Sequence, residues 1–315
     1  MARILVTGAG GFIGYAVTAA LLARGDDVVA TDIVASPRLA RLAAQNPRLA
    51  FTAGEITEWP LVMRLMTEGR PDGIVHCAAV VGVPASVGTP VATFRVNIEG
   101  TINLLEAMRF TGVRRMVNIS SEEIYGAFLA DIIDEEHRCL PTKPYGISKF
   151  VVEQVSRDYA AAHGLEVIHA RTCWVYGPHF PRVRMPRNLL DAAIAGRPLH
   201  LEGGASYAVD QVHIDDVVAG VLLALDKPQH AFDAYHITTG VAVSFAEVVD
   251  IIRSRLPKAD ISVGRGPLRF VDGTEAVKKG ALSIERARRE LGYAPRWSMR
   301  RGLEHWIDLL ETGEG

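Results

Sequence analysis

The sequence contains little cysteine and no excess of charge of either sign. Its 315 residues include only three cysteines, Cys77, Cys139 and Cys173, with no Cys-x-x-Cys pair. This usage argues against a disulfide framework and against a structural zinc site, so no metal is expected. The 34 Lys and Arg residues nearly balance the 36 Asp and Glu residues, which gives a formal net charge of −2. Such a balance disfavours a protein that binds nucleic acid through bulk positive charge.

Long apolar runs and export signals are also missing. No uninterrupted apolar stretch approaches the roughly 20 residues that a membrane helix needs. The first ten residues, MARILVTGAG, lack the long apolar stretch and the small-residue cleavage site of a signal peptide. We therefore expect a cytoplasmic protein with no membrane partner. No linker rich in Gly, Ser or Pro divides the chain, so any two lobes should share one body.

Strand-like and helix-like segments alternate through the first 170 residues. This alternation predicts an α/β fold, a doubly wound parallel sheet with helices on both faces. Short apolar runs predict strands at Arg3–Thr7, Asp27–Thr31, Gly73–Cys77, Arg115–Ile119 and Glu166–Ala170. Apolar residues at helical spacing predict helices at Gly11–Arg24, Trp59–Gly69, Thr89–Thr111 and Pro144–His163.

The alternation becomes irregular after residue 170. The stretch Trp174–Pro186 contains three prolines and a glycine, which predicts a loop. We expect a larger domain over residues 1–170, which residues 209–240 complete, and a smaller C-terminal lobe from residues 171–208 and 241–315. Further helices are predicted at Pro186–Ala195, Ser244–Leu256 and Met299–Leu310, and a strand followed by a helix at Gln211–Leu225.

A glycine-rich turn, TGAGGFIG from Thr7 to Gly14, joins the first predicted strand to the first predicted helix. Gly8 permits a tight turn, Gly11 lets the backbone approach a pyrophosphate, and Gly14 allows close packing of helix and strand. The helix start adds free N–H groups and the positive end of its dipole. In isolation the same pattern is also that of a tight turn without a ligand.

The second predicted strand is followed by Asp32, 18 residues after Gly14. A carboxylate at this place can accept hydrogen bonds from both ribose hydroxyls of a dinucleotide, whereas it repels a 2′-phosphate. No arginine follows until Arg38. Together with the glycines, Asp32 predicts a Rossmann-type domain that binds NAD rather than NADP, although Asp32 alone could be a helix cap or a turn residue.

Tyr145 and Lys149 lie four residues apart at the start of a predicted helix, so they share one face. The ammonium would lower the pKa of Tyr145 by favouring the phenolate. The tyrosine could then remove a proton from an alcohol as hydride passes to a nicotinamide. Ser121 follows a predicted strand whose carboxyl end points to the ligand crevice, where its hydroxyl could bind the reacting oxygen. Without the glycine turn, an exposed tyrosine and an ordinary turn serine would be the better interpretation.

These three elements together resemble the extended short-chain dehydrogenase/reductase family, in particular its NAD-dependent epimerase/dehydratase branch. The resemblance covers nearly the whole chain. Besides TGAGGFIG and YGISK, it includes HCAA from His76, NIEGTINLLEA from Asn97, VYGP from Val175, VHIDDV from Val212 and ELGYAP from Glu290.

The resemblance implies a role for each matching residue. Ser121 matches the family's catalytic hydroxyl, Tyr145 its base, and Lys149 the lysine that also holds the nicotinamide ribose. Members pair through two helices, which implies a homodimer through residues 89–111 and 144–163. The residues that match the cofactor contacts of the family are Gly8, Gly11, Phe12, Ile13, Gly14, Asp32, Glu55, Ile56, Ala78, Ala79 and Asn97.

Three departures from the family pattern concern the substrate. Nucleotide-sugar members usually carry an arginine that grips the diphosphate where this chain has Val209, and an asparagine where it has Trp174. Loss of an anion clamp should weaken diphosphate binding. Glu122 and Glu123 stand where the dehydratases of the family carry an acid and a base. On a strand, however, only one of two adjacent side chains would face the site.

Basic residues could compensate for the missing arginine. The predicted loop at 174–186 and the residue after it supply His179, Arg182, Arg184 and Arg187. One of them could bind a carboxylate or phosphate of a smaller substrate, and a solvated basic loop is the alternative. Candidate substrate residues are thus Glu122, Trp174, His179 and Arg184, and Glu123 is a candidate catalytic residue.

The sequence therefore predicts an NAD-dependent oxidoreductase that moves hydride between a substrate carbinol and NAD. We expect a dehydrogenase or epimerase of a sugar, a sugar acid or a small polyol, so its partner is a small carbohydrate-like molecule. The alternative is a 4-epimerase or 4,6-dehydratase of a UDP-, GDP- or dTDP-sugar. A sensor that binds the cofactor without catalysis is disfavoured, because Ser121, Tyr145 and Lys149 are all present.

Overall fold

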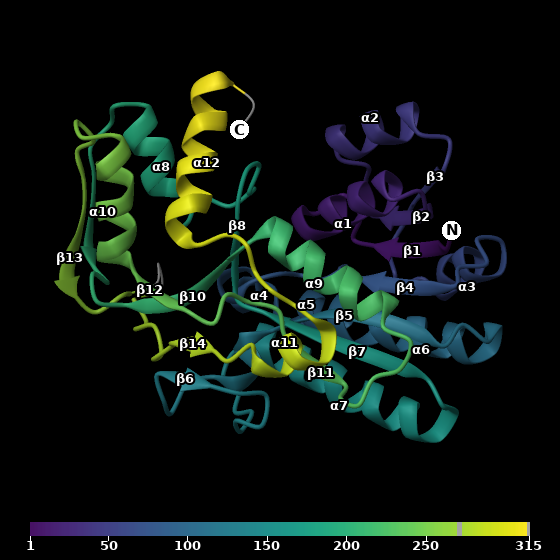
Figure 1. Cartoon of the computed structure of the whole chain (residues 1–315). Coiled ribbons are helices and arrows are strands. Elements are labelled where there is room, and N and C mark those ends of the chain that lie inside the picture. Colours follow the sequence, from purple (N-terminus) through teal and green to yellow (C-terminus); the bar gives the residue numbers. More distant parts are fainter. Residues whose placement is uncertain (270–272, 314–315) are drawn as a thin grey trace.

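The computed structural model describes residues 1–269 and 273–313. At its centre lies a seven-stranded sheet in the order β11-β7-β5-β4-β1-β2-β3, in which neighbouring strands run parallel (Figure 1). The strand order reverses between β1 and β4, which confirms the predicted doubly wound, Rossmann-type sheet. The strands are β1 (Arg3–Thr7), β2 (Asp27–Asp32), β3 (Leu49–Ala53), β4 (Gly73–His76), β5 (Arg115–Ser121), β7 (Glu166–Thr172) and β11 (Ala234–His236).

The alternation of side chains along the strands builds a core on each face of the sheet. Ile4 and Val6 of β1 pack into one core, and Leu5 between them packs into the other. The first face is covered by α1 (Phe12–Ala23), α2 (Pro37–Gln45) and α9 (Ile214–Asp226). The second is covered by α3 (Trp59–Thr67), α6 (Gly100–Thr111) and α7 (Pro144–His163).

Several elements of the larger domain differ from the sequence-based expectation. Both α2 and β3 were missed, since each buries a single residue, Leu39 and Leu49, and therefore lacks a clear apolar pattern. The helix expected at Thr89–Thr111 consists of α5 (Pro90–Phe94), a π-helical turn η1 (Arg95–Glu99) and α6. A short helix, α4 (Val83–Gly88), precedes it. Asn97 lies in the π-helical turn, a feature that is frequent at functional sites.

The smaller lobe has a separate core, which brings together Leu189, Val248, Leu303 and Trp306. Two small sheets frame it, one in the order β12-β10-β8 and one of β9 and β13. The elements are β8 (Trp174–Tyr176), α8 (Arg187–Ile194), β9 (Leu199–Gly203), β10 (Ala208–His213), β12 (Ala242–Ser244), α10 (Phe245–Arg255), β13 (Ile261–Gly266) and α12 (Met299–Thr312). Near the junction lie β6 (Ile132–Ile133), β14 (Ala281–Leu282) and α11 (Glu285–Leu291).

The predicted division between the lobes needs two corrections. The stretch expected as a loop from Trp174 starts with β8, because its backbone pairs with β10. Of residues 209–240, α9 and β11 join the larger domain, whereas β10 pairs with β8 and β12 of the smaller lobe. Residues 314–315 of the expected lobe lie outside the described residues. No helix in the described ranges is long and apolar enough to cross a membrane.

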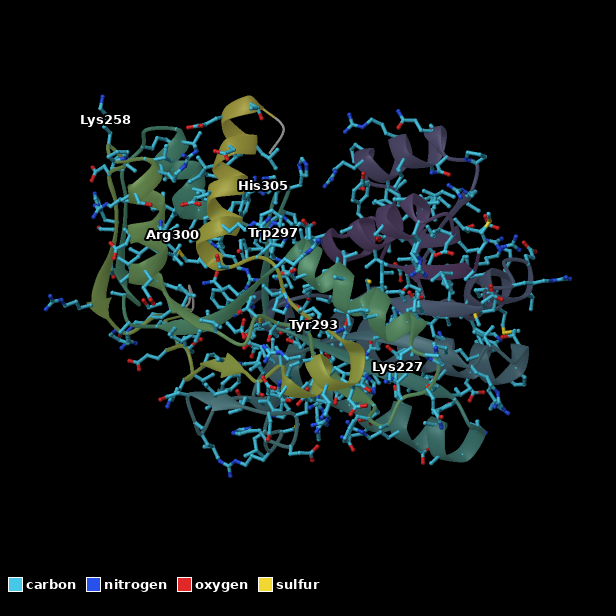
Figure 2. All side chains as sticks on the ribbon, viewed as in Figure 1. Lys227, Lys258, Tyr293, Trp297, Arg300 and His305 are labelled. Atoms are coloured by element: carbon cyan, nitrogen blue, oxygen red, sulfur yellow. The ribbon has the colours of Figure 1, made fainter. Side chains whose placement is uncertain are left out.

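The C-terminal segment joins the two lobes. Both oxygens of the Asp216 carboxylate, in the first turn of α9, accept backbone N–H groups, from Arg296 at 2.9 Å and from Trp297 at 3.0 Å. The Trp297 ring stacks against His213, with ring centroids 4.5 Å apart, and against His305 of α12. Figure 2 labels Trp297 near the lower end of α12 and His305 above it, beside the middle of the helix. These contacts hold the smaller lobe at the carboxyl edge of the sheet.

Candidate active site

A cavity of about 1010 Å³ lies between the two lobes at the carboxyl ends of β1, β2, β4 and β5. This is the place where doubly wound sheets bind ligands, because the loops diverge where the strand order reverses. One end of the cavity is lined by the glycine turn and the ends of the first strands, and the other by residues of the smaller lobe.

The glycine turn has no room for larger side chains. Gly8 has a positive φ of 68°, and a Cβ there would lie 2.6 Å from the backbone nitrogen of Ala78. A Cβ on Gly14 would lie 2.0 Å from the carbonyl oxygen of Gly8. Both glycines therefore permit the close approach of β1, α1 and the segment after β4. Gly11, Phe12 and Ile13 line the cavity where α1 begins, so the helix start can receive a pyrophosphate.

Asp32 ends β2 and lines the cavity beside the glycine turn. Its Oδ2 accepts the N–H of Gly10 at 2.9 Å and its Oδ1 that of Ile33 at 2.7 Å, which orients the carboxylate. Each oxygen can still accept a ribose hydroxyl. The guanidinium of Arg38 lies over the Tyr15 ring, 4.1 Å from its centroid.

The other expected cofactor contacts fall into two groups. Glu55, Ile56, Ala78 and Ala79 all line the cavity. Asn97 is instead buried behind the cavity wall, which corrects the expectation that it lines the groove. Its Oδ1 accepts the N–H of Val80 at 2.7 Å, and its Nδ2 donates to Ser148 Oγ at 2.9 Å. Asn97 therefore positions the wall.

Ser121, Tyr145 and Lys149 all line the cavity. Ser121 is the last residue of β5, and its hydroxyl favours ionisation of the Tyr145 phenol, which lowers the pKa of Tyr145 against the effect of burial. Lys149 Nζ donates to the carbonyl oxygen of Ile119 at 2.7 Å. Two of its three N–H bonds remain for other acceptors.

Close packing fixes Tyr145 relative to Ser121. The N–H of Tyr145 donates to Ser86 Oγ at 3.1 Å, which satisfies one free group at the start of α7. In the next position, a Cβ on Gly146 would lie 2.4 Å from the carbonyl oxygen of Glu123. Only glycine lets α7 approach the turn after β5 this closely.

The electrostatics of Tyr145 differ from the expectation. Burial raises the pKa of Tyr145 to about 12, and the charge that most opposes this is that of Arg182. Lys149 Nζ lies 6.0 Å from the centroid of the Tyr145 ring, and burial lowers the pKa of Lys149 to about 8. The charges that oppose the rise in the pKa of Tyr145 come from Arg182 and Arg184 of the smaller lobe.

Glu122 and Glu123 both line the cavity, although adjacent strand residues would point apart. The reason is that Glu122–Tyr125 form a turn of 3₁₀ helix, η2. Burial raises the pKa of Glu122 to about 7, while the charge of Lys279 opposes the rise. Glu123 forms an ion pair with Lys279, with 3.4 Å between Oε2 and Nζ.

Some of the expected substrate residues of the smaller lobe line the cavity, and others do not. Trp174 and Arg184 line the cavity, and the Arg184 guanidinium lies 4.6 Å from the centroid of the Trp174 ring. His179 is exposed outside the cavity, in a left-handed backbone conformation, which corrects its assignment as a substrate residue. Val209 is fully buried in the core of the smaller lobe, where it cannot replace an anion clamp.

The comparisons with known proteins agree with this geometry. The model of the NAD dependent epimerase/dehydratase family matches residues 4–238. A UDP-glucose 4-epimerase of Mycolicibacterium smegmatis is 31% identical over 98% of this chain and 99% of its own length. The chain belongs to the NAD-dependent epimerase/dehydratase family.

Solved structures of this epimerase/dehydratase family share the whole fold. The UDP-glucose 4-epimerase of Thermotoga maritima with UDP-glucose has a TM-score of 0.89 at 27% identity, covering 99% of this chain and 100% of that one. DesIV, a dTDP-glucose 4,6-dehydratase of Streptomyces venezuelae with NAD and TYD bound, has a TM-score of 0.87 at 29% identity, covering 99% and 98%. The predicted use of NAD by an oxidoreductase of this family is thereby confirmed.

No sequence pattern marks two residues at or near the cavity, Lys279 and Leu268. Lys279 reaches Glu123 from a position 156 residues later in the chain, and nothing in its local sequence marks it. Leu268 also lines the cavity, from a segment that was assigned only to the smaller lobe as a whole. Both positions depend on tertiary packing rather than on a motif.

Proposed function

We propose that this enzyme oxidises a carbinol of a small carbohydrate-like substrate with Ser121, Tyr145 and Lys149. One observation carries the proposal: Ser121, Tyr145 and Lys149 line the same cavity, whose other end fits a dinucleotide at Gly11 and Asp32. A tyrosine and a serine that face one cavity can share one substrate oxygen, as proton transfer from an alcohol requires.

When bound, NAD supplies the acceptor for the hydride of the carbinol. Tyr145 takes the hydroxyl proton, and Ser121 donates a hydrogen bond that holds the reacting oxygen. Lys149 is anchored on the Ile119 carbonyl, so its two remaining N–H bonds would be available to hold the nicotinamide ribose. A ketone that leaves gives a dehydrogenase, and one that is reduced again from its other face gives an epimerase.

We favour a dehydrogenase or epimerase of a sugar, a sugar acid or a small polyol. Val209, which stands where the resemblance places the diphosphate clamp, is an apolar residue buried in the core of the smaller lobe, and Trp174 lines the substrate end of the cavity. A 4-epimerase or 4,6-dehydratase of a nucleotide sugar is the second candidate. It is supported by the relatives with those activities and by the presence of both Glu122 and Glu123 in the cavity wall.

Replacement of Tyr145 tests the proposal. In a Tyr145→Phe variant, NADH formation at 340 nm should fall by a factor of about 10² to 10⁴, because the base is lost. NAD binding, measured by calorimetry, should persist. Tyr159→Phe on the same helix is the matched control, since Tyr159 hydrogen-bonds Glu106 away from the cavity and its loss should leave turnover unchanged. Full turnover by Tyr145→Phe would refute the assignment.

We also propose a cytoplasmic homodimer that pairs through α5, α6 and α7. Val91 and Phe94 on α5 are 79% and 36% exposed, and Phe110 near the end of α6 is 61% exposed. An exposed apolar patch of this kind marks an interface. Three free thiols fit a reducing compartment. Sedimentation at the monomer mass would contradict the dimer.

A further inference from the structure

The substrate end of the cavity holds positive charge that the protein leaves uncompensated. Arg182 and Arg184 both line it, and neither has a carboxylate within 4.0 Å in residues 1–269 and 273–313. Arg184 Nε is buried without a hydrogen-bond partner in the same ranges. Arg187, by contrast, forms an ion pair with Asp191 at 3.1 Å and donates to the Phe180 carbonyl.

The Arg184 guanidinium is held in place by stacking rather than by charge. It lies 4.6 Å from the centroid of the Trp174 ring and 5.2 Å from that of Phe180. Two aromatic faces fix its plane and leave its N–H edges free for a planar acceptor. Desolvation lowers the pKa of Arg184 to about 10, so the group stays charged near neutral pH.

The acidic groups nearby do not supply the missing partner. Glu123 is paired with Lys279 at 3.4 Å. Glu122 is 1% exposed, and neither of its oxygens has a hydrogen-bond partner among the described residues. Because burial raises the pKa of Glu122 to about 7, a large share of this carboxyl group is protonated near neutral pH. The field at this end of the cavity is therefore positive.

This positive charge lines the same cavity as the proposed reacting centre. Arg182, Arg184 and Tyr145 all face it. In a nucleotide sugar, the negative charge lies on the diphosphate, across the sugar ring from the carbinol at C4. A sugar-derived acid carries its carboxylate on the same short carbon chain as the carbinol, so it can place the negative charge at these arginines and the carbinol at Tyr145 within one cavity.

We propose that Arg184, assisted by Arg182, binds a carboxylate of the substrate, so that the substrate is a carbohydrate-derived acid such as an aldonic or uronic acid. This inference rests on the proposed oxidation at Tyr145 and names its substrate class. Planar carboxylates and guanidinium groups form paired hydrogen bonds, which a neutral polyol cannot match.

Matched substrate pairs test the inference with the full chain and saturating NAD. Gluconate and glucitol form one pair, glucuronate and glucose another, and UDP-glucose is a third arm. NADH is followed at 340 nm and isomers by chromatography. We expect turnover of an acid and a value of kcat/KM at least about 10-fold lower for its neutral partner. Equal turnover of the neutral partner, or turnover of UDP-glucose alone, would overturn the inference and leave the proposed oxidation intact.

Variants of Arg184 separate binding from packing. Arg184→Met keeps a long apolar stem against Trp174, and it should lower kcat/KM for the acid by about 10- to 100-fold through loss of charged hydrogen bonds. Arg197→Met, at an exposed arginine after α8, is the matched control and should change nothing.

A binding measurement that needs no turnover completes the test. With NAD present, the acid should raise the melting temperature of Tyr145→Phe but not that of Tyr145→Phe/Arg184→Met. If the acid stabilises Tyr145→Phe while the wild type forms neither NADH nor an isomer, the proposed oxidation fails and the carboxylate site stands. An equal shift in both variants refutes the role of Arg184.

Discussion

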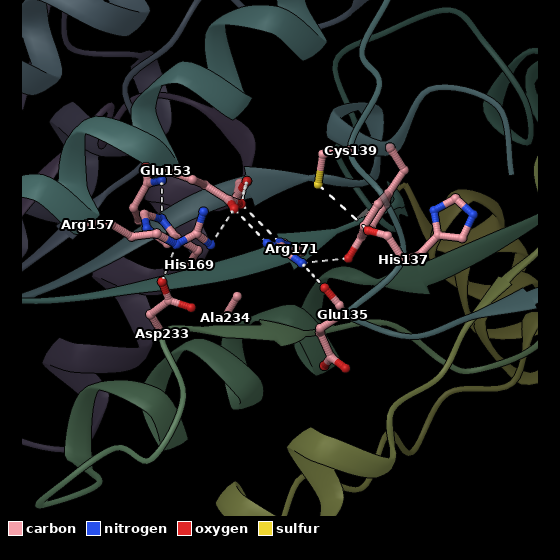
Figure 3. A network of polar contacts seen from close by, with 12 residues as sticks. Glu135, His137, Cys139, Glu153, Arg157, His169, Arg171, Asp233 and Ala234 are labelled. Carbon is pink, nitrogen blue, oxygen red and sulfur yellow. Dashed lines mark hydrogen bonds and ion pairs between the residues drawn. The ribbon is translucent and has the colours of Figure 1, made fainter.

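Two buried clusters of charge lie close together in this enzyme, and they differ in how completely they are paired. The first surrounds Arg171 of β7 (Figure 3). Its Nε and Nη2 donate to the two oxygens of Glu153, at 3.0 and 2.7 Å, and its Nη1 donates to the Tyr125 hydroxyl and the Glu135 carbonyl. Glu153 also accepts the hydroxyl of Ser120 at 2.6 Å. Burial by itself would raise the pKa of Glu153, but the charge of His169 and these donors lower it to about 2.

The second cluster is the substrate end of the cavity. Arg184 Nε and both oxygens of Glu122 are buried without hydrogen-bond partners in the described ranges, and Lys279 has only its ion pair with Glu123. A buried charged group without a partner costs free energy. The chain pairs Arg171 fully at a similar depth, so incomplete pairing at the substrate end is a property of that site. We interpret the first cluster as support for the catalytic elements and the second as a place for a ligand.

The positions of the paired residues explain what the first cluster supports. Ser120 precedes Ser121 on β5, Glu153 lies one turn after Lys149 on α7, and Tyr125 ends the turn that carries Glu122. The ion pair of Arg171 and Glu153 thus ties together the three segments that present the side chains for which we propose catalytic roles. Precise catalysis needs such a rigid second layer.

Removal of Arg171 should give the largest effect on stability. In Arg171→Met, Glu153 keeps only the partial compensation of Arg157 at 3.2 Å, so the free energy of unfolding should fall by about 3 to 5 kcal/mol. Urea unfolding measures this. Adding Glu153→Gln should recover part of the loss, because it removes the uncompensated charge. Arg184→Met is the matched control from the second cluster and should cost less than about 1 kcal/mol. If Arg171→Met and Arg184→Met lowered the free energy of unfolding equally, the proposed difference in pairing between the two clusters would be refuted.

Glu122 provides the next largest effect, which depends on pH. Its pKa is raised by burial from 4.5 to about 7, so the folded state binds a proton that the unfolded state releases between these values. The contribution of Glu122 to the free energy of unfolding is therefore fully present below pH 4.5, and it is lost as the pH rises to 7. Glu122→Gln removes this loss and should be more stable than the wild type above pH 7, by on the order of 2 to 3 kcal/mol, with no gain below pH 4.5. Thermal unfolding across this range measures the difference, and a gain that is independent of pH would contradict it.

The comparison also shows which parts of the enzyme can be predicted from the sequence. The cofactor end depends on local geometry, since Gly8, Gly14 and Asp32 act through turns and strand ends that lie near them in the chain. A motif that encodes a local backbone shape can be recognised in the sequence without knowledge of the fold. The helix that carries Tyr145 and Lys149 can be recognised for the same reason.

The substrate end could not be predicted in this way. Glu123 and Lys279 are 156 residues apart, and their segments are brought together by the pairing of β6 with β14 and by a backbone hydrogen bond from Phe128 to Lys278. Whether both glutamates face the cavity depended on a 3₁₀ turn in place of a strand. The pKa of Tyr145 depends on Arg182, whose distance from the phenol follows from the packing of the second lobe. His179 and Arg184 are both basic residues of the same predicted loop, so the sequence does not distinguish them. In the structure, Arg184 lines the cavity, whereas His179 has a left-handed backbone conformation and does not line it.

Tyr125 gives the smallest predicted effect and examines cooperation within the first cluster. His236 Nδ1 lies 2.9 Å from the carbonyl oxygen of Ser283, which requires an N–H there, so Nε2 accepts the Tyr125 hydroxyl at 2.6 Å. The same hydroxyl accepts a hydrogen bond from Arg171 at 2.7 Å. Tyr125→Phe leaves both partners short of one bond and should cost about 1 to 2 kcal/mol in urea unfolding. Because Arg171 is a shared partner, Tyr125→Phe and Arg171→Met should together cost less than the sum of their separate losses. Strictly additive losses would mean that the residues around Arg171 act as separate contacts. The two clusters would then differ only in how many of their polar groups are paired, and not in whether the contacts depend on one another.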